Sequence, residues 1–393
     1  MRVFPEPLAA ASTAPAGRAE TAAEWLSRST VPLAVSSRSL LNSWASLPGA
    51  VDGDVLARLR QRDDGQFGAA FLELYLFAAF RRAGWPCERL TGRGRTPDFK
   101  VVTPEGPMYV EATTAGAPRQ QTDAERRKGL LLDAVDALQC DGFTLAVAVA
   151  AVGASSLAPG PVKRELADWL AGLDPDAVLA AVAAAPARTE SDEKAGYPVH
   201  VVARDGWDVE WTAYPLSPEW RGQQGRLIDF ERMPEVVAVE DEKPLRNALQ
   251  HKASRYGRLD APYLVAVGEE PFSPLDVQDH RVKALYGSSA VVVDGPQAGR
   301  LVRLPNGSWR RGGTWRHTRV CGVVFLAGLR PWTALEAVPE LWLNPAAVLS
   351  VPGFLPYWRV QRVDELAGEG WLRTGLPAVS PASFWAADRG ARD

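Results

Sequence analysis

Cysteine is scarce in this sequence of 393 residues, and the three that it has, Cys87, Cys140 and Cys321, are far apart and odd in number. This distribution argues against a disulfide framework and against a zinc-binding knuckle. It fits the reducing conditions of the cytoplasm, where we expect the protein to be located. The four histidines show no spacing typical of zinc ligands, so a zinc site is not expected either.

Long apolar runs are also lacking. No segment approaches the 18 consecutive apolar residues that a membrane-spanning helix needs, and no membrane partner is expected. Residues 1–20 are rich in Ala and Pro but have no apolar core followed by a cleavage site. We therefore predict a disordered leader there rather than a signal peptide.

Several catalytic motifs are absent. The sequence has no GxxxxGK[ST] phosphate loop, no GxSxG elbow and no HExxH, so a nucleotide cofactor, a serine hydrolase and a zinc protease lack support. The formal net charge of −3 gives no general attraction to nucleic acid, and a polyanion would need a local basic patch. Lysine is rare, and its seven positions are Lys100, Lys128, Lys163, Lys194, Lys243, Lys252 and Lys283.

The hydrophobic pattern predicts an α/β protein. Apolar residues on both sides of 66–84 predict a helix buried nearly all round. A strand at 143–152 without polar–apolar alternation is typical of the middle of a sheet, where both sides are covered. A helix at 243–257 followed by a strand at 262–268 forms an αβ unit, and a hairpin is expected at 299–311 with its turn at Asn306–Gly307. Together they predict a mixed central sheet flanked by helices.

The segment 95-RTPDFKVVTPEGPMYVEATT-114 predicts a second hairpin. Pairing about a turn at 103–108 sets Lys100 against Glu111 and Asp98 against Thr113. Because side chains alternate along a strand, these four residues share one face. Glu73 lies within the buried helix, where an unpaired carboxylate costs several kcal/mol. It therefore needs an arginine, a backbone donor or a metal.

These acids carry a resemblance. Glu73 in a core helix, Pro97–Asp98 at a strand start and Glu111-Ala112-Thr113 in the next strand resemble the PD-(D/E)XK nuclease superfamily, in a bacterial branch with E-x-T in place of E-x-K. The resemblance implies a restriction-endonuclease-like core. We expect that core at 63–285, after a leader at 1–20 and a helical extension at 21–62 and before a β-rich, irregular extension at 286–393.

The resemblance also implies a function, which is metal-dependent hydrolysis of phosphodiester bonds in nucleic acid, with DNA favoured over RNA. Glu73, Asp98 and Glu111 would hold Mg²⁺ or Mn²⁺, since clustered carboxylate oxygens suit such ions. The cation would neutralise charge at the phosphate and activate water.

Position 113 departs from the motif, because it holds Thr where the superfamily has Lys. Thr113 itself or a displaced lysine, Lys100, Lys128 or Lys252, would then contribute to catalysis. Alternatively the site is inactive, and the protein is a nucleic-acid-binding or scaffold module. For each lysine a solvated charge or a simple ion pair is the structural alternative.

Two further segments are candidates for nucleic-acid contact. The loop before Asp98 contributes Arg93 and Arg95, and the segment 308–317 contributes Arg310, Arg311 and Trp315. Arginine meets phosphate and aromatic rings stack on bases. The structural alternatives are a plain connection and a hairpin edge. A homodimer is left open by the sequence.

Overall fold

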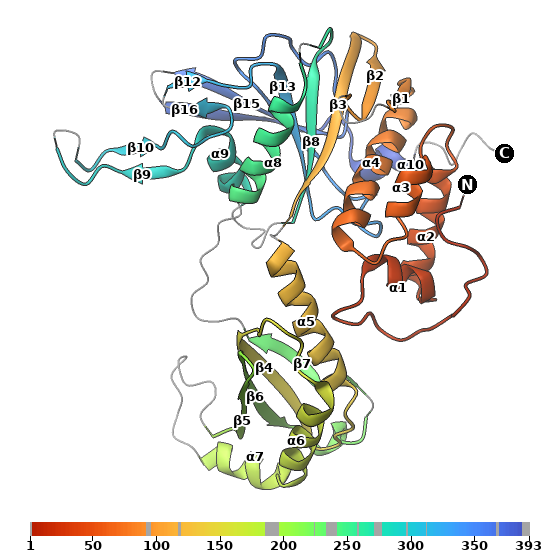
Figure 1. The fold of residues 1–393 in the computed structure, drawn as a ribbon, viewed down its shortest axis with the longest axis vertical. Helices are drawn as coiled ribbons and strands as arrows, with labels where there is room; N and C mark the ends of the chain where they lie inside the picture. The colour runs from red at the N-terminus through yellow and green to blue at the C-terminus, as the bar shows by residue number, and fades with distance from the viewer. Residues whose placement is uncertain are drawn as a thin grey trace. The chain divides into compact units, whose positions relative to one another are not determined.

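The structure, a computed structural model, describes residues 2–91, 96–116, 119–184, 196–223, 225–232, 242–257, 259–270, 277–295, 298–311, 313–366 and 369–386. The chain forms two compact units (Figure 1). Unit 1 comprises Met1–Ala14, Thr21–Gly116 and Val239–Asp393, and unit 2 comprises Pro15–Glu20 and Ala117–Ala238. Most of unit 2 is therefore an insertion into unit 1.

Unit 1 is built on an eight-stranded mixed sheet with the order β1-β2-β3-β8-β13-β14-β15-β16. Strand β2 pairs antiparallel with both β1 and β3, whereas β3, β8 and β13 run parallel to one another. The strands are β1 (Cys87–Arg89), β2 (Phe99–Thr103), β3 (Gly106–Ala115), β8 (Tyr263–Glu269), β13 (Val320–Ala327), β14 (Glu340–Leu343), β15 (Arg359–Leu366) and β16 (Glu369–Gly375). The predicted mixed α/β fold is confirmed.

Helices cover both faces of this sheet, and each face has its own apolar core. One core joins the sheet to α1–α4 and α10, and the other joins it to α8 and α9. The helices of unit 1 are α1 (Ala22–Arg28), α2 (Pro32–Ala45), α3 (Gly53–Arg58), α4 (Asp64–Arg82), α8 (Glu242–Arg255), α9 (Val277–Tyr286) and α10 (Pro381–Ala386). Among the described residues no helix has the length and apolarity needed to cross a bilayer.

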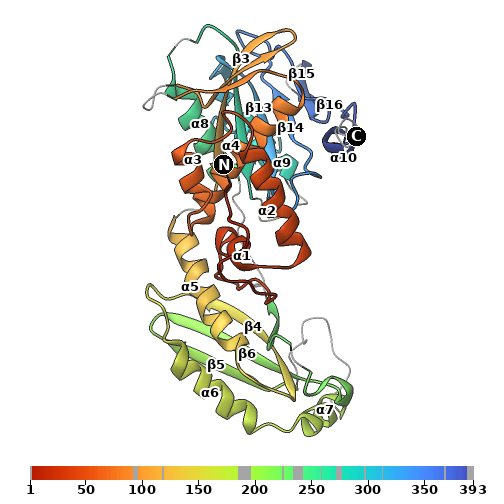
Figure 2. The same cartoon turned by 90° about the vertical axis from the view of Figure 1, so that its right-hand side faces the viewer.

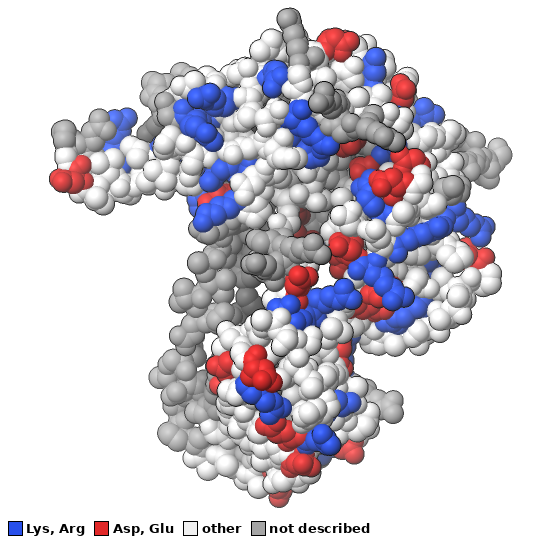
Figure 3. All heavy atoms as spheres, in the orientation of Figure 1, with Lys and Arg blue, Asp and Glu red and all other residues white. Residues whose placement is uncertain are grey.

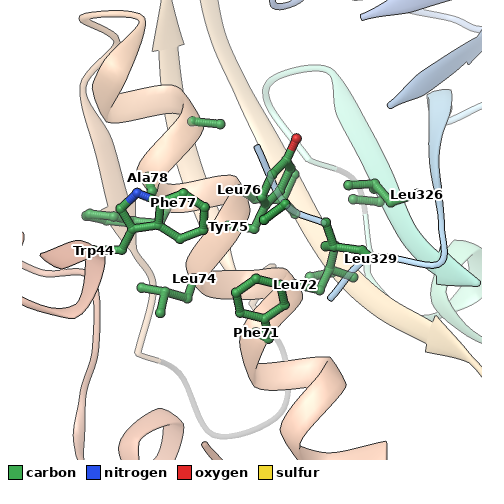
Figure 4. Packing of buried hydrophobic residues seen from close by; sticks show 14 of the residues in the cluster. Trp44, Phe71, Leu72, Leu74, Tyr75, Leu76, Phe77, Ala78, Leu326 and Leu329 are labelled. Atoms are coloured by element: carbon green, nitrogen blue, oxygen red, sulfur yellow. The ribbon is translucent and has the colours of Figure 1, made fainter. Parts of the chain in front are cut away.

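Helix α4 is the central element of the first core. It starts at the N-cap Asp63, whose side chain accepts a hydrogen bond from the Gln66 amide, and it has two arginines in its last turn, where they favour the helix dipole. Its side chains are buried on all sides, as the sequence predicts. Figure 4 shows Phe71, Tyr75 and Phe77 of α4 packed among residues that include Trp44 of α2 and Leu326 of β13.

The start of the chain is packed at Val3 and Phe4, within the range 1–20 for which the sequence predicts a disordered leader. Val3 and Phe4 are buried in the first core. Their backbone amides donate to the Asn42 side-chain oxygen over 2.7 and 3.1 Å. Two apolar side chains and two satisfied amides offset the entropy of ordering this short segment.

Unit 2 has a four-stranded sheet with the order β5-β6-β4-β7 and its own apolar core. Figure 2 shows α6 running along this sheet. The elements are α5 (Arg119–Asp136), β4 (Phe143–Ala151), α6 (Pro159–Ala171), α7 (Pro175–Ala184), β5 (Val199–Arg204), β6 (Trp207–Pro215), a 3-10 turn (Pro218–Trp220) and β7 (Ile228–Arg232). The range 63–285, expected to be one core, thus contains most of a second unit, and the apolar strand predicted at 143–152 lies in the sheet of unit 2 rather than in the main sheet.

Two small hairpins complete unit 1. The first pairs β9 (Ser289–Val291) with β10 (Leu301–Arg303), and the second pairs β11 (Arg310–Arg311) with β12 (Thr314–Trp315). The single hairpin predicted at 299–311 is therefore wrong. Asn306 does not close a turn between its flanking strands, because its side-chain oxygen accepts the Ser288 amide and joins the two ends of the first hairpin.

Candidate active site

The β2–β3 hairpin sets the positions of the two motif acids. Phe99 pairs with Val110 and Lys100 pairs with Tyr109, so the predicted register is wrong by two residues. Continued by one residue, the observed register places Asp98 opposite Glu111. A shift of two residues keeps every side chain on its predicted face, so the alternation survives and the two acids come closer together than expected.

Asp98 lies half-buried just before β2. One of its carboxylate oxygens accepts a hydrogen bond from the Ala112 amide over 2.7 Å. Burial, followed by the charges of Glu111 and Glu73, raises the pKa of Asp98 to about 7, and the Ala112 amide and Lys252 oppose this rise. The ionised form of Asp98 is therefore disfavoured first by burial and then by the negative charge of its neighbours.

Glu111 lies on β3 and is fully buried. The Lys252 ammonium of α8 contacts its Oε1, and the Tyr256 hydroxyl donates to its Oε2 over 2.6 Å. An Arg255 guanidinium nitrogen lies 3.7 Å from Oε1. Lys252 is 141 residues away in sequence, and it is the displaced lysine, among those considered, that the fold brings to the motif acids.

Helix α8 holds these partners through its apolar side and a tyrosine pair. Leu245 and Leu249 are buried in the second core. The Tyr256 ring lies edge-on to Tyr263, with 5.6 Å between the ring centroids. The Tyr263 hydroxyl donates to the Lys252 carbonyl over 3.3 Å. These contacts fix the last turn of α8 over Glu111.

Arg255 and Tyr256 are site residues that the sequence analysis missed. They follow Lys252 by three and four positions, which is the spacing of neighbours on one helical face. That spacing would identify both residues once Lys252 is known to face the acids. The sequence left three candidate lysines, however, so it did not indicate which element faces them.

Glu73 has different partners. Its two oxygens accept from Arg58 at 2.9 Å and from Arg89 at 2.5 Å; Glu73 is buried, and both arginines are half-buried. Of the partners that the sequence analysis considered for a buried Glu73, the structure therefore shows arginine. Glu73 affects Asp98 through its charge. Within the described part of the chain no three Asp, Glu, His or Cys side chains come together closely enough to hold an ion as they stand.

The other predicted catalytic residues lie as follows. Thr113 is half-buried on β3, on the same face as Glu111. Lys100 is half-buried on β2, opposite Tyr109 rather than Glu111. Lys128 belongs to unit 2, where its ammonium lies 2.7 Å from Glu231. Thr113 therefore remains beside the motif acids, and Lys128 has a partner within its own unit.

The candidate nucleic-acid contacts divide into two groups. Arg93 and Arg95 lie outside the described residues. Arg310 and Arg311 form β11, and Trp315 of β12 pairs with Arg310. The Arg310 guanidinium stacks over the Trp315 ring, 5.6 Å from its centroid. The structure thus places the second group on one small hairpin of unit 1.

Comparison with protein-family models found no match, and comparison with curated proteins and with solved structures found none that is significantly similar.

Proposed function

We propose that this protein is a metal-dependent nuclease that hydrolyses phosphodiester bonds, with DNA favoured over RNA as the substrate. The observation that carries the proposal is the convergence of Asp98, Glu111 and Lys252. The lysine comes from a helix that follows a whole inserted unit, yet its ammonium contacts the second motif acid. An acid pair with an adjacent lysine is the set of groups that the PD-(D/E)XK resemblance calls for.

The donor set fits a divalent cation. Mg²⁺ is commonly held by one or two carboxylates together with substrate phosphates and water, so Asp98 and Glu111 are sufficient protein ligands. The raised pKa of Asp98 supports this, because the charge of Glu111 contributes to it and an added cation would relieve it. When bound there, the cation would supply charge neutralisation at the phosphate and a more acidic water. Glu73 is left out of the ligand set, because two arginines hold it.

Lys252 takes the place of the lysine that Thr113 replaces. Its side chain is mostly buried, and the carboxylate of Glu111 fixes the position of its ammonium. A positive charge held there is suited to stabilise negative charge on the phosphate in the transition state or to orient the attacking water. Tyr256 holds the other oxygen of Glu111 and so keeps the carboxylate from rotating.

The test is a calorimetric titration of Mn²⁺ into the wild-type protein and into Glu111→Gln. Asp260→Asn is the matched control, since Asp260 accepts a hydrogen bond from Tyr109 of the same hairpin and is exposed. We expect saturable binding by the wild type and by the control, and none by Glu111→Gln. Absence of Mn²⁺ binding by the wild type, with and without DNA, would refute a metal-dependent nuclease.

Cleavage is then assayed on a mixture of supercoiled, linear and single-stranded DNA. We expect Lys252→Met to bind Mn²⁺ but to lose cleavage, since the ammonium acts on the phosphate or water rather than on the cation.

A second candidate function is a nucleic-acid-binding module that has lost catalysis. The observation that favours it is the direct contact between Lys252 and Glu111, because an ion pair of this kind is stable without any cation. Wild-type protein that binds DNA without binding Mn²⁺ would establish this alternative.

A further inference from the structure

Positive charge is concentrated in one segment of unit 1. Residues 295–319 contain six arginines and no aspartate or glutamate, although the whole chain has a net charge of −3. The six are Arg300, Arg303, Arg310, Arg311, Arg316 and Arg319, and they are called the arginine surface below. Unit 1 as a whole has 31 Lys and Arg against 27 Asp and Glu, whereas unit 2 has 13 against 20. The positive charge that a polyanion would need is therefore enriched in this segment of unit 1.

The fold brings part of this surface together around His317. Burial, followed by the charges of Arg311, Arg319 and Arg316, lowers the pKa of His317. Arg316 and Arg319 are within two residues of His317 in the sequence, so Arg311 is the arginine that the hairpin brings to this imidazole. Arg300, Arg311 and Arg316 are exposed. On the face shown in Figure 3, Lys and Arg side chains gather over β12 and α9.

The arginine surface is connected to the candidate active site by direct contacts. Arg319 donates to the Tyr256 carbonyl over 2.8 Å, and the Tyr256 hydroxyl donates to Glu111. Arg255, about one-third exposed, lies in the last turn of α8 next to Tyr256 in the sequence, and a guanidinium nitrogen of Arg255 is 3.7 Å from Glu111. A polyanion bound at Arg319 would therefore lie close to Tyr256 and Arg255, both of which contact Glu111.

The aromatic residues of the segment are not arranged for stacking on bases. Trp309 is 2% exposed and packs edge-on against Tyr286. Trp315 also packs against Tyr286, and Arg310 covers its ring. Single-stranded nucleic acid is usually bound by open aromatic faces, whereas a duplex offers phosphates and keeps its bases stacked. This arrangement favours a duplex.

We propose that the arginine surface binds the phosphate backbone of a nucleic-acid duplex and directs it to Asp98 and Glu111. The second part of this inference rests on the proposed nuclease function, and the first part does not. Because the contacts are to phosphate, binding is expected to depend on salt and to be nearly independent of base sequence.

The test is fluorescence anisotropy with a labelled DNA duplex, its single strand and an RNA duplex of the same sequence, all in EDTA so that no cleavage occurs. The variant is the triple substitution Arg300→Gln, Arg311→Gln and Arg316→Gln. The charge-matched control is Arg2→Gln, Arg62→Gln and Arg81→Gln, three exposed arginines from the side of the sheet that α1–α4 cover. Urea midpoints of both triple variants verify that they fold.

We expect the wild type to bind the DNA duplex more tightly than the single strand. Each lost phosphate contact should reduce the slope of log affinity against log salt by about 0.9. The slope of the arginine-surface variant should therefore be smaller by up to about 2.7, and its affinity at moderate salt should be at least about tenfold lower. The control should keep the wild-type slope. Equal losses in both variants, preference for the single strand, or no duplex binding by the wild type would overturn the inference.

The two proposals fail separately. Glu111→Gln should bind the duplex with the wild-type salt slope, whatever the Mn²⁺ titration shows, because Glu111 contributes no positive charge to the surface. Duplex binding without Mn²⁺ binding would support the arginine surface and refute the nuclease. Mn²⁺ binding without duplex binding would support the metal site of the nuclease and refute the arginine surface.

Discussion

Asp98→Asn should stabilise the protein at neutral pH. Asparagine keeps the shape of Asp98 and an oxygen that can accept the Ala112 amide, but it removes the charge. The pKa of Asp98 is raised from 3.8 to about 7 by burial and by the charges of Glu111 and Glu73. Ionised Asp98 is therefore a source of instability in the folded protein, and the substitution removes it.

The sign and size follow from proton linkage. Below about pH 4 the carboxyl is neutral in both the folded and the unfolded state, and this effect is absent. Between about pH 4 and pH 7 the unfolded state releases its proton while the folded state keeps it, so the wild type loses stability at about 1.4 kcal/mol per pH unit. The loss levels off above pH 7, and a shift of this size corresponds to at most about 4 kcal/mol.

The assay is urea unfolding, followed by tryptophan fluorescence, of the wild type and Asp98→Asn from about pH 4 to pH 8. The difference between the two proteins removes the contribution of the titrating groups that do not interact with Asp98. We expect the advantage of Asp98→Asn to grow as pH rises to 7 and to remain constant beyond it. A difference that does not vary with pH would refute the reasoning. Added Mn²⁺ should stabilise the wild type, which retains both carboxylates, more than it stabilises Asp98→Asn.

Two further substitutions separate support of the fold from support of the site. Glu73→Gln leaves the mostly buried Arg89 without its carboxylate partner, whereas Arg58 keeps Asp54, so the substitution should cost at most about 3–5 kcal/mol in urea unfolding. Mn²⁺ affinity should be unchanged, and its loss in calorimetry would return Glu73 to the ligand set. Tyr256→Phe removes a hydrogen bond to the buried carboxylate of Glu111. It should cost about 1–3 kcal/mol in urea unfolding and should weaken Mn²⁺ binding. An unaltered Mn²⁺ affinity would show that the hydroxyl does not position Glu111.

The sequence was sufficient to locate the two acids on one face of a hairpin but not to align them. Alternation along strands depends on side-chain chemistry within each strand, so it can be read locally. The register depends on the turn, and the segment 103–108 allowed a pairing shifted by two residues that buries the same apolar set. The prediction therefore placed Lys100 opposite Glu111, where the structure has Asp98.

The separate unit was not foreseen for a related reason. A strand without alternation such as 143–152 indicates burial on both faces, but it does not indicate which sheet it joins. In the structure β4 is buried mainly over its first half, and Ala150 and Ala151 are exposed. Lys252 was among the candidates because lysine is rare, yet only tertiary structure brings α8 to β3. Arg255 and Tyr256 belong to no sequence motif, and only the contact between α8 and β3 shows that they lie beside Glu111.

The insertion also determines when the site can exist during synthesis. Glu111 leaves the ribosome 141 residues before Lys252. At the usual rate of about 5–20 residues per second, this interval lasts about 7–30 seconds. During that time unit 2, which has its own core, can fold. The Glu111 carboxylate, which is fully buried in the final structure, does not yet have its partners Lys252 and Tyr256. The nascent chain therefore passes through a stage at which the acids are present and the site is incomplete.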